Sequence, residues 1–201
     1  MQLITLDNLA DCCIHLTNLI QLCKEAEQEN IAASENMKFT DWQLNNASLL
    51  YLLINEQRFF APNGCLNIVY HDNKIIAVSG VYISDFSKDI AIAGVRAYTL
   101  KNYRTRYVHG DTIFPAQITW AKAKNTKMIL LSFNSYNDWL YKFILRGSKG
   151  KGTAFGLKFS DTYKKFKPHK KQIIIKHVPQ YILKLALEDD YNYDFTSIEQ
   201  N

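Results

Sequence analysis

One stretch, Met128 to Tyr141, constrains the fold more than any other part of this sequence. It opens with Met128-Ile-Leu-Leu-Ser-Phe133, an apolar run bounded by polar residues, which is typical of a strand covered on both faces of a sheet. The polar residues from Asn134 to Asp138 are good helix caps, so we expect a short helix to follow and to carry Tyr141. Because open α/β sheets bind ligands at the carboxyl ends of their strands, we expect Asn134 and Tyr141 to face one crevice.

The rest of the chain supplies partners for that strand. The clearest β signal is a pair of runs, Cys65–Tyr70 and Lys74–Ile83, joined by His71-Asp72-Asn73 as in a hairpin. Further strands are expected at Gln2–Leu6, Asp89–Thr99, Ala154–Phe159 and Gln172–Lys176, a polar loop at Lys101–Asp111, and helices from Asp7 or Asn8 to Glu29, from Thr40 onward, from Pro115 to Asn125 and from Pro179 to Leu187. We therefore expect one α/β domain over residues 1–187 and a loose acidic tail over residues 188–201.

Composition excludes several classes of protein. Hydrophobic residues make up 47% of the 201 residues and aromatic residues 13%, which is enough for a sizeable core and excludes a disordered chain. No run approaches the length of a membrane span, and the first residues do not resemble a signal peptide, so a cytoplasmic protein without membrane contact is expected. The four cysteines lack metal-ligand spacing and are expected to be buried thiols rather than a zinc site: Cys12, Cys13, Cys23 and Cys65.

Positive charge is concentrated in one segment. Between Lys142 and Lys176 there are eleven lysines and arginines and one acid, Asp161, so this segment carries +10 while the whole chain carries +5. Its densest part holds five lysines interleaved with aromatic residues and a histidine: Lys164, Lys165, Lys167, Lys170 and Lys171, with Phe159, Tyr163, Phe166 and His169. Such a run is usually a solvated hairpin tip, but it also suits an anionic partner, either nucleic acid or an acidic protein.

The predicted order is a strand, two helices, three antiparallel strands, a helix, a strand, a helix and two strands. Over roughly residues 1–178 it resembles the GNAT superfamily of acyl-CoA-dependent N-acyltransferases, which implies a mixed, mostly antiparallel sheet of six to seven strands with four or five helices. The segment Asn134-Ser-Tyr-Asn-Asp-Trp-Leu-Tyr141-Lys142 is similar to the family's Asn-x-x-Ala-x-x-x-Tyr-x-Lys pattern, with Asn137 at the place of the small residue.

The resemblance implies roles for these residues. Asn134, with Asn137 beside it, would contact the pantetheine arm of CoA, and Tyr141 would protonate the departing thiolate. The residues alone leave simpler interpretations open. Asn134 also suits a helix cap, and in a chain with twelve tyrosines Tyr141 also suits the core.

A second motif, Thr99-Leu-Lys-Asn-Tyr-Arg104, is similar to the family's lead-in to its pyrophosphate loop. The family continues with a glycine-rich loop, whereas this chain continues Thr105-Arg-Tyr-Val-His109-Gly110 and has a glycine only at the end. The resemblance implies phosphate contacts from Arg104, Arg106 and Gly110, with guanidinium groups replacing part of the backbone donation. Solvated arginines, or arginines alternating with aromatics on nucleic acid, remain alternatives.

The strand before this loop would complete the site. By resemblance, the backbone of Val95, Ala97 and Tyr98 would hold the pantetheine and polarise the thioester carbonyl. The strand carries no acid after Asp89, so the general base stays open among Tyr98, Arg96, His71 and His109, and none is assigned.

The implied activity is transfer of an acyl group, acetyl by expectation, from acetyl-CoA to an amine by direct attack in a ternary complex. The alternative is a module of the same fold that lacks catalysis and binds nucleic acid or an acidic protein through residues 142–176.

Overall fold

The computed structural model describes residues 1–22, 24–25, 28, 59–106, 108–134, 141–142, 144–146, 161–169, 172–175 and 178–195. These residues belong to two compact units. The first unit comprises Met1–Tyr82 and Arg96–His109, and the second comprises Ile83–Val95 and Gly110–Asn201. Two expected elements, the helix from Thr40 and the strand Ala154–Phe159, lie outside the described residues.

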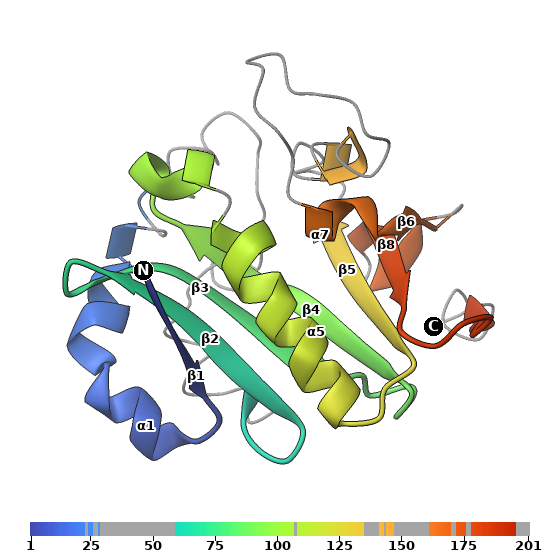
Figure 1. Cartoon of the computed structure of the whole chain (residues 1–201), viewed down its shortest axis with the longest axis horizontal. Helices are drawn as coiled ribbons and strands as arrows, with labels where there is room; N and C mark the ends of the chain where they lie inside the picture. Colours follow the sequence, from blue (N-terminus) through green and yellow to red (C-terminus); the bar gives the residue numbers. More distant parts are fainter. Residues whose placement is uncertain are drawn as a thin grey trace. The chain divides into compact units, whose positions relative to one another are not determined.

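The described strands form a mixed sheet (Figure 1). They are β1 (Gln2–Leu6), β2 (Gly64–His71), β3 (Lys74–Ile83), β4 (Ile90–Thr99), β5 (Met128–Asn134), β6 (Lys167–Pro168), β7 (Ile173–Ile175) and β8 (Val178–Ala186). Hydrogen-bonded neighbours follow the order β1-β2-β3-β4-β5-β8-β6, and β7 also pairs with β8. The β4–β5 pairing is parallel, whereas β1–β2, β2–β3 and the pairings of β8 are antiparallel. The expected mixed α/β architecture is therefore confirmed. The strand predicted at Gln172–Lys176 is β7, and the short strand β6 extends the expected sheet.

In the first unit, β2 and β3 form the predicted hairpin. Asp72 and Asn73 have φ angles of 49° and 59°, which asparagine and aspartate tolerate and which a two-residue type I′ turn requires. The pair His71–Lys74 closes the ladder beside this turn. Most residues of both strands are buried, as expected for strands covered on both faces.

The same unit contains α1 (Leu9–Ile14), and helical residues resume from Leu16 to Leu22 after a turn at His15. The Asn8 side chain caps α1 by accepting a hydrogen bond from the Asp11 N–H, at 2.9 Å. Cys12 and Cys65 are buried as predicted, but Cys13 is exposed, so that prediction is wrong for one thiol. Consecutive residues of a helix point to different faces, so Cys12 and Cys13 cannot both face the core.

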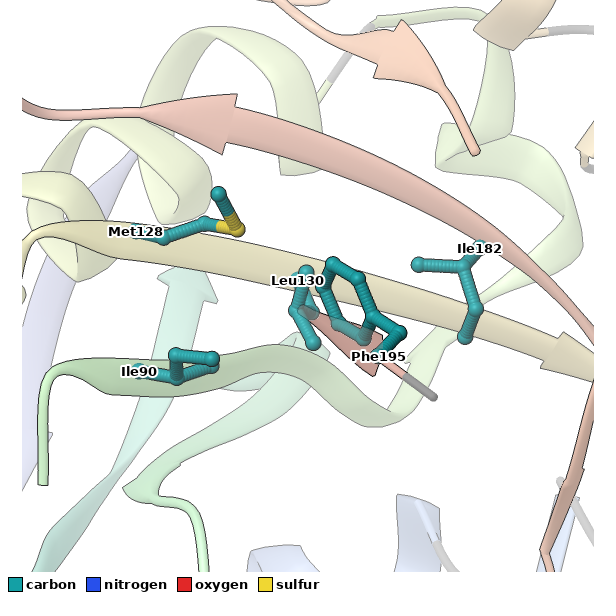
Figure 2. Packing of buried hydrophobic residues seen from close by; sticks show 5 residues of the cluster. All are labelled: Ile90, Met128, Leu130, Ile182 and Phe195. Carbon is teal, nitrogen blue, oxygen red and sulfur yellow. The ribbon is translucent and has the colours of Figure 1, made fainter. Parts of the chain in front are cut away.

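In the second unit, β5 is the central strand. Its parallel partner is the first part of β4, and β8 runs antiparallel to it over all seven residues from Met128 to Asn134. One core cluster lies where these strands meet, as Figure 2 shows: Ile90, Met128, Leu130, Ile182 and Phe195.

Two C-terminal expectations are wrong. The helix predicted from Pro179 to Leu187 is instead the strand β8, because pairing with β5 outweighs the local helix-start signal of Pro179. The tail is not loose as far as Phe195, which is 4% exposed and packs into the core cluster together with Tyr191 and Tyr193.

The predicted loop at Lys101–Asp111 is also wrong. Lys101–Arg106 form a 3₁₀ helix, η2, and Val108–Ile113 form a π-helix, η3, which continues directly into α5 (Phe114–Ala123). Among the described residues between Lys101 and Ile113, none has a positive φ. Residues with a Cβ favour right-handed over left-handed backbone, which is compatible with the helical turns seen here.

A further described helix is the short α7 (Asp161–Lys164), and residues 141–142 and 144–146 are helical too, as expected for the segment that carries Tyr141. None of the helices in the described ranges is long and apolar enough to cross a membrane.

Candidate functional site

The parallel ladder between β4 and β5 ends before either strand does. It runs from the pair Ile90–Met128 to the pair Ala93–Leu131, while β4 continues to Thr99 and β5 to Asn134. The end of a short parallel ladder leaves strand backbone that is no longer paired on that side. Ligands of α/β sheets bind at such carboxyl ends.

A glycine and a buried glutamine stand at the end of this ladder. Gly94 has a φ of +68°, and its N–H donates to the Oε1 of Gln117 on α5, at 3.2 Å. Gln117 is completely buried. A Cβ at position 94 would lie 3.0 Å from Leu131 Cδ2 and 3.3 Å from Phe114 Cε1. The backbone angle therefore favours glycine, and the two neighbouring side chains would have to shift slightly to admit a larger residue.

Tyr141 lies against the end of β5. Its ring contacts the Phe133 ring at 5.9 Å between centroids and stacks on the Tyr181 ring of β8 at 4.6 Å, with 16° between the ring planes. Phe133 and Tyr181 are direct partners in the β5–β8 ladder. Because side chains alternate along a strand, Phe133 shares its face of β5 with Leu131, the residue that touches the Gly94 position. Tyr141 and the Gly94 position at the end of the ladder therefore contact the same face of β5.

The environment of Tyr141 keeps its phenol protonated. Burial raises the pKa of Tyr141 above its usual value of 10, and the neighbouring Tyr181 phenol raises it further. The hydroxyl makes no hydrogen bond to another described residue that would hold it away from a ligand. A half-buried neutral phenol can donate a proton to a developing anion, which is the role the sequence predicted for this residue.

In the first unit, Arg104 is tied to the end of β4. Its Nε donates to the Thr99 carbonyl oxygen at 2.9 Å, and its guanidinium lies 5.5 Å from the centroid of the Tyr98 ring. These contacts orient the side chain while the residue as a whole stays exposed. Arg106 closes η2, and its side chain lies outside the part of the chain that is described.

His109 does not suit the role of general base. Its Nε2 lies 3.4 Å from the Tyr98 carbonyl oxygen, so the neutral ring donates from that nitrogen. Burial lowers the pKa of His109 to about 4, and the Tyr98 carbonyl opposes this shift only in part. His109 thus links η3 to β4. His71, a second candidate, sits at the β2–β3 turn beside Asp72 and the ring of Tyr103.

The other predicted contact residues are distributed as follows. Val95, Ala97 and Tyr98 lie on β4, in its partly exposed stretch beyond the ladder end. Gly110 is buried near the start of the helical run formed by η3 and α5. Asn134 is the last residue of β5 and pairs with Gln180, but its side chain, like the whole of Asn137, lies outside what is described.

In the basic segment the described lysines are exposed, but two of the aromatic residues between them are buried. Lys164, Lys165 and Lys167 are exposed, whereas Lys170 and Lys171 are not among the described residues. Tyr163 and Phe166 are 4% and 2% exposed and pack against the Phe114 ring of α5, at 5.9 and 6.2 Å. These two aromatic rings belong to the core, so they cannot stack on nucleic acid bases as one interpretation of the sequence required.

Three residues of the site were missed. Gly94 could have been noticed, because an isolated glycine inside a strand pattern indicates a bulge or a close approach. Gln117 could not, since one glutamine on a helix carries no signal of burial. Tyr181 was missed because its strand was predicted as a helix.

No family model matches the sequence, and no curated protein matches it. Solved structures do match. A GNAT-family acetyltransferase from Staphylococcus aureus Mu50 superposes with a TM-score of 0.58 at 13% identity, covering 93% of this chain and 100% of that one. An acetyltransferase from Streptococcus agalactiae 2603 gives 0.57 at 15% identity, covering 92% and 98%.

A third solved structure is the PaiA N-acetyltransferase of Thermoplasma acidophilum in complex with coenzyme A. It superposes with a TM-score of 0.56 at 13% identity, covering 92% of this chain and 99% of that one. Identities this low establish the fold alone. The chain therefore has the fold of the GNAT acetyltransferases.

Proposed function

We propose that this chain is an acyl-CoA-dependent N-acyltransferase that moves an acyl group, acetyl in the simplest case, from CoA to an amine by direct attack in a ternary complex. The observation that carries the proposal is the position of Tyr141, a half-buried phenol packed against the strand end where the β4–β5 ladder has stopped. The fold supports it, since a solved structure of the same fold is an N-acetyltransferase in complex with coenzyme A.

In this proposal the residues at the strand ends would hold the thioester end of acetyl-CoA. Beyond Ala93 the β4 backbone is not paired with β5, so Val95, and after it Ala97 and Tyr98, would offer backbone groups to the pantetheine arm. A backbone N–H aimed at the thioester carbonyl would stabilise the negative charge that develops there. Asn134 and Asn137 would add amide contacts to the same arm.

The bond changes require one proton donor on the leaving-group side. The amine nitrogen forms a bond to the thioester carbonyl carbon, the carbon–sulfur bond breaks, and the sulfur takes the proton of the Tyr141 hydroxyl. A positioned acid of this kind contributes about 10²- to 10⁴-fold to a rate. The proton lost by the amine passes to solvent. His109 is a poor acceptor for it, because burial lowers its pKa to about 4 and its Nε2 donates to the Tyr98 carbonyl oxygen.

The phosphates of CoA would be held by charge and by a helix end. η3 and α5 form one helical run from Val108 to Ala123, whose first N–H groups include that of Gly110. Such groups favour anions. Arg104, oriented by its bond to the Thr99 carbonyl, and Arg106 would add guanidinium donors, which suit phosphate oxygens.

Thermal unfolding with CoA and acetyl-CoA tests the proposal. A ligand that binds only the folded chain stabilises it by about 2.7 kcal/mol at a hundredfold excess over its Kd. ATP at the same ionic strength controls for nonspecific anion effects. No shift in Tm at millimolar acetyl-CoA would refute the enzyme. If a shift occurs, Tyr141→Phe should lower kcat about a hundredfold while the Kd for CoA changes less than twofold; equal loss of both would make Tyr141 structural.

A second candidate function is a non-catalytic module that binds an anionic partner. It is favoured by the exposure of Lys164, Lys165 and Lys167, and Lys170 and Lys171 would extend the same basic surface. The burial of Tyr163 and Phe166 favours an acidic protein over nucleic acid within this candidate. Retention on a polyanion column that falls steeply with salt, without any effect of acetyl-CoA on Tm, would support this function instead of acyl transfer.

A further inference from the structure

We propose that Tyr181 is the positioning residue for Tyr141, holding the phenol of the general acid at the end of β5. This inference rests on the proposed acyl transfer and names a residue on another strand as part of it. The proposal concerns how the ring is held. Tyr181 itself would touch neither the thioester nor the amine.

The geometry is a platform of two rings with a third ring lying on it. Phe133 and Tyr181 face each other directly across the antiparallel β5–β8 ladder, so their side chains leave the sheet on the same face and side by side. Tyr141 lies nearly parallel to the Tyr181 ring, at 4.6 Å and 16°, and tilted against the Phe133 ring, at 5.9 Å and 56°. The closer and flatter of the two contacts is the one to Tyr181.

A stacked platform restricts the phenol in the way a general acid needs. The Tyr141 ring is stacked on Tyr181 and also contacts the tilted ring of Phe133. These two contacts leave it little freedom to rotate, so its hydroxyl points in a fixed direction. The platform residues sit on β5 and β8, which are paired over seven residues, and sites built on strands are more precise than sites built on loops. Burial against this platform also raises the pKa of Tyr141, and the Tyr181 phenol adds to the effect.

Steady-state kinetics separate positioning from mere packing. Tyr181→Leu removes the platform and should lower kcat by roughly tenfold to a hundredfold, because a small displacement of a reacting group has that effect, with the KM for acetyl-CoA changed less than twofold. Tyr181→Phe keeps the ring and should restore kcat to within about threefold of the original chain. Tyr193→Leu is the matched control, because Tyr193 is another aromatic residue of the second unit but packs on Phe86 and Phe195. Its kcat per folded molecule should be unchanged.

An activity-independent measurement keeps this inference separate from the proposed function. With tyrosine labelled at ¹³Cζ, and the Tyr141 signal assigned from Tyr141→Phe, the phenol should titrate above pH 10 in the original chain and closer to 10 in Tyr181→Leu. An original chain that turns over no acetyl-CoA but shows this difference would sink the enzyme and retain the stacked pair. An active chain in which Tyr181→Leu matches it in kcat, or in which the Tyr141 titration is identical in both, overturns the role of Tyr181.

Discussion

Replacing Gly94 with alanine tests whether the ladder end depends on this one glycine. Gly94 has a φ of +68°, and a left-handed backbone costs a residue with a Cβ roughly 1–2 kcal/mol. The new methyl group would lie 3.0 Å from Leu131 Cδ2 and 3.3 Å from Phe114 Cε1. Both distances are shorter than ordinary contact, and overpacking a close-packed site costs about 1–3 kcal/mol. We therefore expect Gly94→Ala to lower the free energy of unfolding by about 2–5 kcal/mol.

Urea unfolding followed by circular dichroism measures this loss, and a second substitution divides it into its parts. Leu131→Val shortens the side chain that bears Cδ2, so it should relieve the steric part of the Gly94→Ala cost and leave the backbone part. The double variant should then be about 1 kcal/mol more stable than the sum of the single effects. A loss below about 1 kcal/mol for Gly94→Ala, or strict additivity with Leu131→Val, would refute the reasoning.

Two further predictions concern stability. His109 has a pKa of about 4 in the folded chain against 6.5 in the unfolded chain, so the unfolded chain takes up the proton first as pH falls. The stability that the neutral ring contributes is complete above pH 6.5 and is lost as pH falls toward 4, by up to about 3 kcal/mol. Between pH 6.5 and pH 4 the free energy of unfolding of His109→Gln should therefore fall by about 3 kcal/mol less than that of the original chain. Identical plots of unfolding free energy against pH for the two chains would contradict the lowered pKa of His109. Phe195→Ala should lower the free energy of unfolding by about 3–5 kcal/mol, because the ring is 4% exposed and lies in the core cluster. Leu9→Ala is the control, since Leu9 is 57% exposed and its loss should change that free energy by less than about 0.5 kcal/mol. Equal losses would show that the C-terminal segment does not pack as described.

Elements with a local signal were predictable from the sequence. The β2–β3 hairpin follows from two β-rich runs and from Asp72 and Asn73, which tolerate the left-handed turn that joins them. The buried strand at Met128 follows from an apolar run of the right length. In both cases the residues that determine the element lie within the element itself.

Elements that depend on distant partners were not predictable. Pro179 is a good first residue of a helix, and it is equally compatible with the start of β8, where it pairs with Ile174. The choice is made by seven pairings with β5, some fifty residues away in the sequence. Because β8 was predicted as a helix, the sequence analysis missed both this strand and Tyr181, the candidate site residue that it carries.

The segment that should bind phosphate shows how one missing residue type changes a mechanism. A glycine-rich loop turns several backbone N–H groups toward an anion because glycine adopts left-handed backbone without cost. Here η2 and η3 are helical, and helical N–H groups point along the axis and bond to carbonyls of the same segment, except in the first turn. Backbone donation is therefore limited to the first turn of η2 and to the start of the run at Val108. If this chain binds CoA as proposed, most of its affinity for the phosphates comes from charged side chains such as Arg104. Interactions between exposed charges are the ones that salt screens most strongly.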